Sequence, residues 1–76
     1  MAELLAELAR RLVDEPDAVS VEEVEEDDGL VLRLTVAPDD VGKVIGRQGR
    51  IVRALRQVIR AAATRDGRRV FVEVVG

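Results

Sequence analysis

Residues 42–60, GKVIGRQGRIVRALRQVIR, combine glycine and arginine at a spacing that could bind phosphate. Gly42 precedes the four-residue turn Gly46-Arg47-Gln48-Gly49, and Arg50 follows it directly. Two glycines allow a sharp turn and let a ligand approach the backbone without a Cβ in the way. A helical pattern follows the turn, and the unpaired N–H groups and dipole at the amino end of a helix favour an anion. We therefore expect a phosphate-binding turn with mobile positive charge beside it.

Other chemistry has little support in the residue types. The spacing G-x-x-x-G-x-x-G fits neither the dinucleotide fingerprint G-x-G-x-x-G nor the P-loop G-x-x-x-x-G-K-[ST]. The chain has no cysteine and no histidine, so it lacks thiolate metal ligands, the commonest metal ligand and the commonest general base. We expect neither an enzyme nor a bound cofactor or metal.

The charge of the chain is divided between its two halves. Residues 1–42 carry three basic and thirteen acidic side chains, a net charge of −10, whereas residues 43–76 carry nine basic and two acidic ones, a net charge of +7. Charges are screened over about 8 Å at physiological salt. A local basic patch can therefore attract a polyanion although the whole chain carries −3.

The length of 76 residues indicates one small domain, residues 1–76. Chains this short bury only about 60% of their unfolded surface, so a partner subunit would add stability. No apolar run approaches the roughly 18 residues of a membrane span, and the acids in MAELLAELARRLVDE come too early for a signal peptide. We expect a cytoplasmic protein.

Hydrophobic periodicity predicts a helix followed by a hairpin. One apolar stripe at helical spacing, ending before Pro16, comprises Leu4, Leu5, Leu8, Ala9, Leu12 and Val13. The segments VSVEEVE and LVLRLTV flank EDDG, which predicts a hairpin with Asp28-Gly29 at its tip. In the second segment one face comprises Leu30, Leu32, Leu34 and Val36, and the other comprises Val31, Arg33 and Thr35. The first segment alternates less clearly and leaves its register open.

The second half predicts two helices and a strand. DDVGKVIG predicts a helix of one or two turns that begins with two acids and ends at Gly46. A long amphipathic helix begins at Arg50, with Ile51, Leu55, Val58, Ile59 and Ala62 on one side and Arg53, Arg56, Gln57 and Arg60 on the other. RDGRR predicts the turn that ends it, and VFVEVV predicts the last strand. The expected fold is α+β, in the order α-β-β-α-α-β, with a three-stranded sheet and the helices packed on one face.

The glycine segment resembles a known family. VIGRQGRIVRAL is similar to the signature V-I-G-x-x-G-x-x-h-x-x-h of KH domains, in which h is apolar and Val52 and Leu55 take the two h positions. The order of elements matches the type II arrangement of that fold, whereas type I begins with a strand. The resemblance covers nearly the whole chain, and a free-standing KH domain of this length resembles the small bacterial KhpA family.

This resemblance implies binding of single-stranded RNA. In KH domains the GxxG loop clamps the backbone of about four nucleotides, and an adjacent groove receives the bases. Carried over by motif position, the clamp comprises Gly46, Arg47, Gln48 and Gly49. The apolar floor would comprise Val44, Ile45, Val52 and Leu34, and the rim would comprise Lys43, Arg50 and Arg53. Base stacking is nearly excluded because Phe71 is the only aromatic residue.

The family resemblance also implies self-association, a larger KH-containing partner of the KhpB type, and a role as a small bacterial post-transcriptional regulator or RNA chaperone. An alternative of another class is a protein-interaction module on a KH scaffold, with incidental RNA contact. Small residues on the flank of the long helix offer a hypothesis for a dimer surface: Ala54, Ala61, Ala62 and Ala63.

Several features keep two interpretations open. The arginine side chains at positions 53, 56 and 60 could each contact RNA or simply face solvent. The acidic segment EEVEEDD is interpreted as a solvated turn that discourages edge pairing. Core packing is favoured for Phe71, with an exposed partner contact as the alternative.

Overall fold

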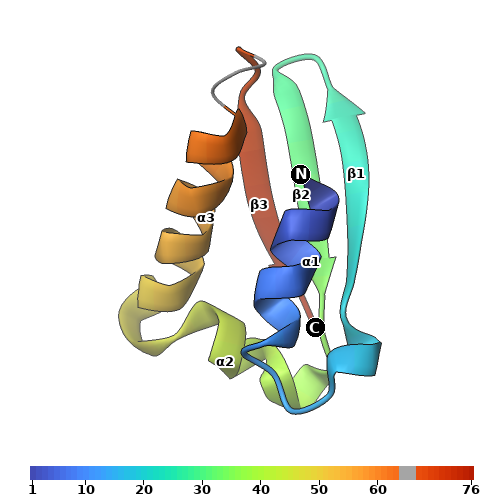
Figure 1. Cartoon of the computed structure of the whole chain (residues 1–76), viewed down its shortest axis with the longest axis vertical. Coiled ribbons are helices and arrows are strands. Elements are labelled where there is room, and N and C mark those ends of the chain that lie inside the picture. Colours follow the sequence, from blue (N-terminus) through green and yellow to red (C-terminus); the bar gives the residue numbers. More distant parts are fainter. Residues whose placement is uncertain (64–66) are drawn as a thin grey trace.

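The computed structural model describes residues 1–63 and 67–76, in which α1 and α3 lie over one face of a three-stranded sheet (Figure 1). The sheet has the order β1-β2-β3, with strands Ser20–Glu26, Gly29–Thr35 and Val70–Val75. β1 and β2 are antiparallel, and β2 and β3 are parallel. The helices are α1 (Ala2–Arg10), α2 (Val41–Ile45) and α3 (Arg50–Ala63). The predicted α+β fold and its order of elements are confirmed, with short 3₁₀ turns at Pro16–Ala18, Pro38–Asp40 and Arg47–Gly49.

The core lies between the helices and the sheet. Its fully buried large side chains are Leu5, Leu32, Leu34, Val44 and Ile59. One predicted face of β2 is confirmed, since Leu30, Leu32, Leu34 and Val36 are buried. Val31 on the other face is only 9% exposed as well. Because parallel pairing places β3 beside β2, α3 packs across the sheet and positions the glycine segment at one end of the molecule (Figure 1).

The hairpin turns one residue earlier than the sequence predicted. Glu26 pairs with Gly29, so Asp27 and Asp28 form the tip and Gly29 begins β2. Gly29 has φ +151, and a Cβ at this position would lie 2.2 Å from the carbonyl oxygen of Arg69. The same oxygen accepts the N–H of Leu30 at 2.8 Å. Glycine is therefore needed here because the entry to β3 passes close to the hairpin.

Two apolar stripes are less buried than their periodicity predicted. α1 ends at Arg10, and Leu4 and Leu12 are each 38% exposed, whereas Leu5 and Ala9 are fully buried. On α3, Val58 is 46% exposed, and Ala62 is exposed as well. The predicted apolar sides were wider than the surfaces that the sheet and the facing helix cover.

Arg56 is not on the solvent-facing side of α3 that the sequence predicted. Its side chain is half-buried, and its guanidinium donates to the carbonyl oxygen of Val72 at 3.3 and 3.4 Å. The contact joins α3 to β3, an edge strand of the sheet. A side chain predicted to be solvated or bound to RNA therefore has a structural role.

The expectation that Phe71 packs in the core is wrong. Its neighbours Val70 and Val72 face the core and are 7% and 5% exposed, whereas Phe71 is 42% exposed. Alternation places Phe71 on the outer face of the sheet, where it pairs in register with Val31. Neither α1 nor α3 covers that face (Figure 1).

The turn predicted for RDGRR lies partly outside the described residues. Its described part, Gly67 to Arg69, is exposed and leads into β3. Across residues 1–63 and 67–76, no helix is long and apolar enough to cross a membrane.

Candidate nucleic-acid interface

α2 places the glycine segment, and the acids before it have a different role from the one predicted. Asp40 precedes α2 but makes no side-chain cap. Its carboxylate is only 2% exposed, and it accepts the backbone N–H of Glu15 at 3.0 Å. Burial would raise the pKa of Asp40, but the N–H groups of Glu15 and Asp14 and the charge of Lys43 outweigh it and hold the pKa below its ordinary value. Asp40 thus ties α2 to the segment after α1.

Lys43 is part of the same network. Its ammonium pairs with the carboxylate of Asp14 and lies 3.6 Å from that of Asp40. The hydrogen bond to Asp14 raises the pKa of Lys43 above its ordinary value. Lys43 was predicted to line the rim of an RNA groove. The structure shows its charge shared between two carboxylates, which reduces the field that it presents to a polyanion.

The GxxG turn, residues 46–49, follows α2 through backbone conformations that favour glycine. Gly46 has φ 77 and ψ 170, and a Cβ there would lie 2.6 Å from a side-chain carbon of Ile51. Gly49 has φ 72, and its nearest Cβ neighbour would be 3.8 Å away. Gln48 is left-handed as well, at φ 58 and ψ 25, which costs a non-glycine residue about 1–2 kcal/mol. The first glycine is therefore required for space and conformation, and the second for conformation alone.

The amide groups of this turn divide into paired and unpaired ones. The N–H of Gly46 bonds to the carbonyl of Gly42 at 2.8 Å, and that of Gly49 bonds to the carbonyl of Gly46 at 3.1 Å. The N–H of Arg50 bonds to the carbonyl of Arg47. Within the described chain, the N–H groups of Arg47 and Gln48 have no such partner. The unpaired donors that suit a phosphate thus lie in the turn itself, before α3 begins.

Arg53 holds the turn from within α3. Its guanidinium donates to the carbonyl oxygen of Gln48 at 2.9 Å. The bond engages the residue with the left-handed conformation, so Arg53 stabilises the shape of the turn. The sequence predicted Arg53 as a rim residue and gave no signal for this contact, because a bond to a main-chain carbonyl depends on the turn geometry.

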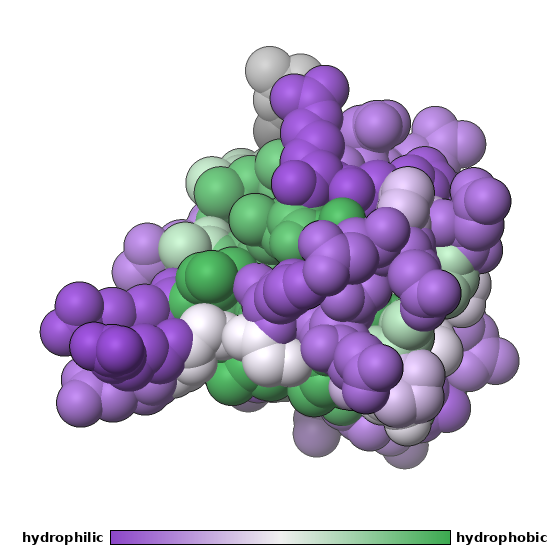
Figure 2. Space-filling view, turned by 90° about the horizontal axis from the view of Figure 1, so that it is seen from below, coloured by the Kyte–Doolittle hydropathy of each residue, from purple (hydrophilic) through white to green (hydrophobic). Residues whose placement is uncertain are grey.

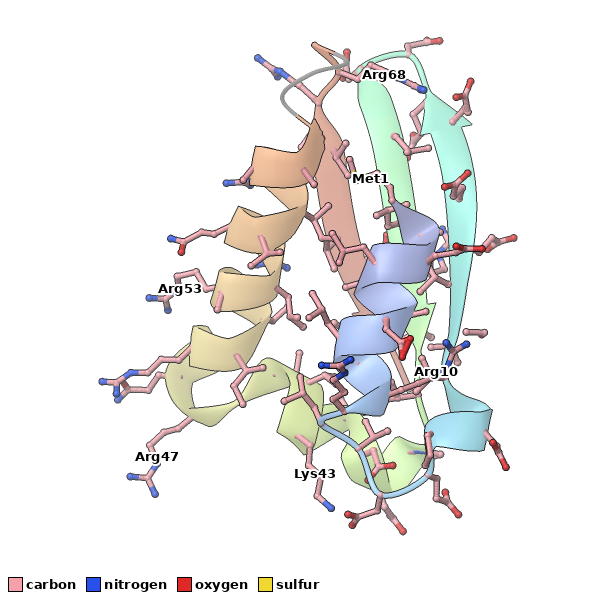
Figure 3. All side chains as sticks on the ribbon, viewed as in Figure 1. Met1, Arg10, Lys43, Arg47, Arg53 and Arg68 are labelled. Atoms are coloured by element: carbon pink, nitrogen blue, oxygen red, sulfur yellow. The ribbon has the colours of Figure 1, made fainter. Side chains whose placement is uncertain are left out.

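The remaining cations at the turn are open to a ligand. Arg47 and Arg50 are exposed, and neither guanidinium makes a hydrogen bond or ion pair with the described residues. Arg47 extends away from the body of the molecule, and Arg53 lies farther along α3 on the same side (Figure 3). Two exposed guanidiniums therefore flank the unpaired amide groups.

The predicted apolar floor needs correction. Val44 and Leu34 are 0% exposed and Val52 is 6% exposed, so these side chains belong to the interior rather than to a surface that bases could touch. Ile45 is half-buried and remains accessible. The three interior residues position the turn, because they fix α2 and the start of α3 against the sheet.

An apolar groove that the sequence did not predict lies between α1 and α3. It has a volume of about 380 Å³ and is lined by Leu8, Leu12, Ile51, Ala54, Leu55 and Val58, with Arg11 and Arg50 at its edge. Seen from the end that carries α2, apolar surface is visible between projecting polar side chains (Figure 2). The signal in the sequence was a second apolar row, Leu4-Leu8-Leu12, which continues from α1 into the residues after it and exceeds what one packed face requires. Of the alanines predicted for a dimer surface, the groove includes Ala54.

Among residues 1–63 and 67–76, no three His, Cys, Asp or Glu side chains are arranged so that they could hold a metal ion.

Comparisons with known proteins agree on one family. Residues 2–74 match the family model described as the KhpA/KhpB KH domain. The chain is 52% identical to the RNA-binding protein KhpA of Clostridium acetobutylicum, over 99% of this chain and 100% of that protein. It is 48% identical to the KhpA of Caldanaerobacter subterraneus, also over 99% of this chain and 100% of that protein.

Solved structures show the same fold within a larger protein. Two structures of Era match 96% of this chain, at 24% sequence identity, and the chain spans 28% of their length. One is Aquifex aeolicus Era bound to GDP and AlF4⁻, with a TM-score of 0.63. The other is Era in complex with MgGDPNP and nucleotides 1506–1542 of 16S ribosomal RNA, with a TM-score of 0.64. At this identity, the likeness concerns the fold alone.

Proposed function

Because this chain belongs to the KhpA/KhpB family of KH domains, we propose that it binds single-stranded RNA through the GxxG turn. The observation that carries the proposal is the pair of unpaired amide groups at Arg47 and Gln48, flanked by the exposed guanidiniums of Arg47 and Arg50. Both relatives are named RNA-binding proteins, which supports the same ligand class.

In the proposed mechanism, the main chain of the turn grips the sugar-phosphate backbone. The two free N–H groups donate to phosphate oxygens, and the missing side chain at Gly49 lets the strand approach. The guanidiniums of Arg47 and Arg50 neutralise neighbouring phosphates, and Ile45 offers the accessible apolar contact to a base. Arg53 positions the turn, and Lys43 contributes less because Asp14 and Asp40 share its charge.

Such an interface binds weakly. If about three or four phosphates are neutralised, log K falls with log salt at a slope of roughly −2 to −3. So few contacts give an affinity on the order of micromolar, about −8 kcal/mol. We place this activity in the bacterial cytoplasm, as that of a small post-transcriptional regulator or RNA chaperone that acts by binding rather than by catalysis.

The test in cells compares two matched glycine variants. Gly49 and Gly67 both have positive φ, 72 and 66, and neither has a close neighbour for an added Cβ. Gly49→Asp places a carboxylate in the clamp, whereas Gly67→Asp adds the same charge at the other end of α3. Crosslinking and sequencing of bound RNA should recover far less RNA from Gly49→Asp than from Gly67→Asp. Equal recovery from both variants would remove the clamp from the mechanism.

A second proposal concerns assembly, and the apolar groove between α1 and α3 supports it. The groove exposes Leu12 and Val58, at 38% and 46%, on a chain too short to bury a large core of its own. We propose a homodimer that packs this groove against its copy and, in the same way, a KH-containing partner of the KhpB type. If variants of the GxxG turn left assembly intact while variants of the groove abolished it, the protein-interaction function would be separate from RNA contact.

A further inference from the structure

The outer face of the sheet carries an apolar row close to the hairpin. Val24 pairs with Val31, and Val31 pairs with Phe71, so one side chain from each strand forms the row. Phe71 is 42% exposed, and no helix covers it. It is also the only aromatic residue in the chain. A large exposed aromatic side chain on an uncovered sheet face is typical of a contact surface.

A cavity opens beside this row. It has a volume of about 270 Å³ and is lined by Glu26, Asp27, Asp28, Val31 and Phe71. The next pair on the same face of the hairpin is Glu26 with Gly29, and the glycine contributes no side chain. Since close approach of Arg69 requires that glycine, the gap beside Val31 is built into the hairpin.

The carboxylates of the cavity are uncompensated. Glu26, Asp27 and Asp28 make no ion pair with any residue in ranges 1–63 and 67–76. Three other acids of the sheet have ion-pair partners: Arg33 lies 3.2 Å from Glu22 and 3.8 Å from Glu73, and Arg68 lies 2.7 Å from Glu25. The cavity therefore combines an apolar floor with three negative charges that attract a cation.

We propose that this cavity, which we call the acidic pocket (residues 26–28, 31 and 71), binds an arginine- or lysine-bearing segment of a partner protein. The aliphatic stem of the basic side chain packs on Val31 and Phe71, its cation lies over the aromatic ring, and the carboxylates pair with it. The hairpin and the GxxG turn lie at opposite ends of the molecule (Figure 1), so both ligands can bind together. The proposal goes beyond RNA binding.

Charge favours protein over RNA as the occupant. Three uncompensated carboxylates repel phosphate. Phe71 also borders a second cavity, lined by Arg60, Arg68 and Arg69 among others, where a nucleic-acid base could stack. Arg68 there already pairs with Glu25. Stacking of RNA on Phe71 is therefore the competing outcome that the experiment must distinguish.

The test titrates the ¹⁵N-labelled full chain with a blocked peptide of alternating arginine and leucine, followed by NMR. We expect amide shifts at residues 26–31 and 70–72, and a peptide in which glutamate replaces arginine should produce none. Phe71→Ala should lower the affinity for the arginine peptide about tenfold, and so should the double variant Asp27→Asn with Asp28→Asn. The control pair Glu3→Gln and Glu7→Gln removes the same charge from exposed positions on α1 and should leave affinity unchanged.

Three results would overturn the proposal. Equal weakening by the control pair would reduce the interaction to nonspecific charge attraction. Loss of RNA affinity in Phe71→Ala with unchanged peptide affinity would assign the ring to base stacking. A change in self-association, measured by light scattering, would make a second copy the occupant. Unchanged melting temperatures in the Asp27 and Asp28 variants keep these results independent of folding.

Discussion

Gly46 and Gly49 look equivalent in the motif, yet they meet different surroundings. Both have positive φ, but a Cβ at Gly46 would clash with Ile51 at 2.6 Å, whereas a Cβ at Gly49 would make only an ordinary contact with Val52 at 3.8 Å. The same turn keeps Gln48 left-handed and ties its carbonyl to Arg53. One glycine therefore belongs to the packing of the turn, and the other to the surface that a ligand approaches.

Substitution by alanine should destabilise the protein by different amounts at the two glycines. Gly49→Ala adds only the cost of a left-handed alanine, about 1–2 kcal/mol of unfolding free energy. Gly46→Ala adds overpacking against Ile51, for a total of roughly 2–4 kcal/mol. Urea unfolding of both variants measures the difference. Equal destabilisation would show that the turn relaxes around the added methyl group.

The arginines at the turn should separate by their salt dependence. Arg47→Gln removes a phosphate contact, so the slope of log K against log salt should become shallower by about 0.7. Arg53→Gln should weaken binding while keeping the slope, and it should accelerate hydrogen exchange within the turn, because its bond to Gln48 shapes the turn. Arg10→Gln, an exposed cation on α1, serves as the control. Identical slopes for the Arg47 and Arg53 variants would contradict this division of roles.

At the scale of elements, α2 is held in place by charge. Asp40 is buried, and its pKa is lowered in the folded protein, so the carboxylate stabilises the fold above its ordinary pKa of 3.8. That contribution is lost as pH falls through the lowered value. In urea unfolding, wild type should exceed Asp40→Asn in stability near neutral pH, and the gap should narrow below pH 3.8. A stability difference between wild type and Asp40→Asn that stays constant with pH would contradict an ionised Asp40 in the folded protein.

Periodicity and turn chemistry were enough to predict the elements, because every second residue of β2 from Leu30 is apolar and the GxxG turn separates α2 from Arg50. They were not enough to predict burial. A strand alternates whichever face is covered, so Phe71 could not be assigned a face before the positions of α1 and α3 were known. The same limit explains Val58 on α3, whose apolar side is wider than its contact surface.

Contacts between residues that are far apart in the sequence could not be predicted either. The sequence predicted only that two acids begin the short helix, but the carboxylate of Asp40 accepts the N–H of Glu15, 25 residues earlier. It predicted Val44 and Val52 as a ligand surface, because motif position says nothing about depth, and both lie in the interior. The GxxG turn itself was located correctly, since glycine spacing is a local signal. Its contact with RNA remains the proposal.

At the scale of the whole molecule, the GxxG turn and the groove between α1 and α3 adjoin at Arg50, whereas the hairpin that carries the acidic pocket lies at the opposite end (Figure 1). Pairing two chains through the groove would place two weak RNA clamps in one particle. Where both engage one strand, avidity should rise by about 10²-fold. Weak individual binding and useful overall affinity are then compatible.

The dimer should depend on the groove. Val58→Arg introduces a charge at an exposed apolar position, so light scattering should show a monomer for this variant and a dimer for the wild type. Gln57→Arg places the same charge on the preceding residue, which is also exposed, and is the matched control. Wild type that stays monomeric at high micromolar concentration would contradict the proposed assembly.

The central claim is that main-chain amides of the GxxG turn hold the RNA backbone. The most direct measurement is an NMR titration of the ¹⁵N-labelled chain with a short single-stranded RNA. We predict that the amide signals of Arg47 and Gln48 shift most, and that Gly49→Asp abolishes the shifts while Gly67→Asp keeps them. If RNA bound while the amide signals of residues 46–49 did not move, the claim that main-chain amides of the GxxG turn hold the RNA would be wrong.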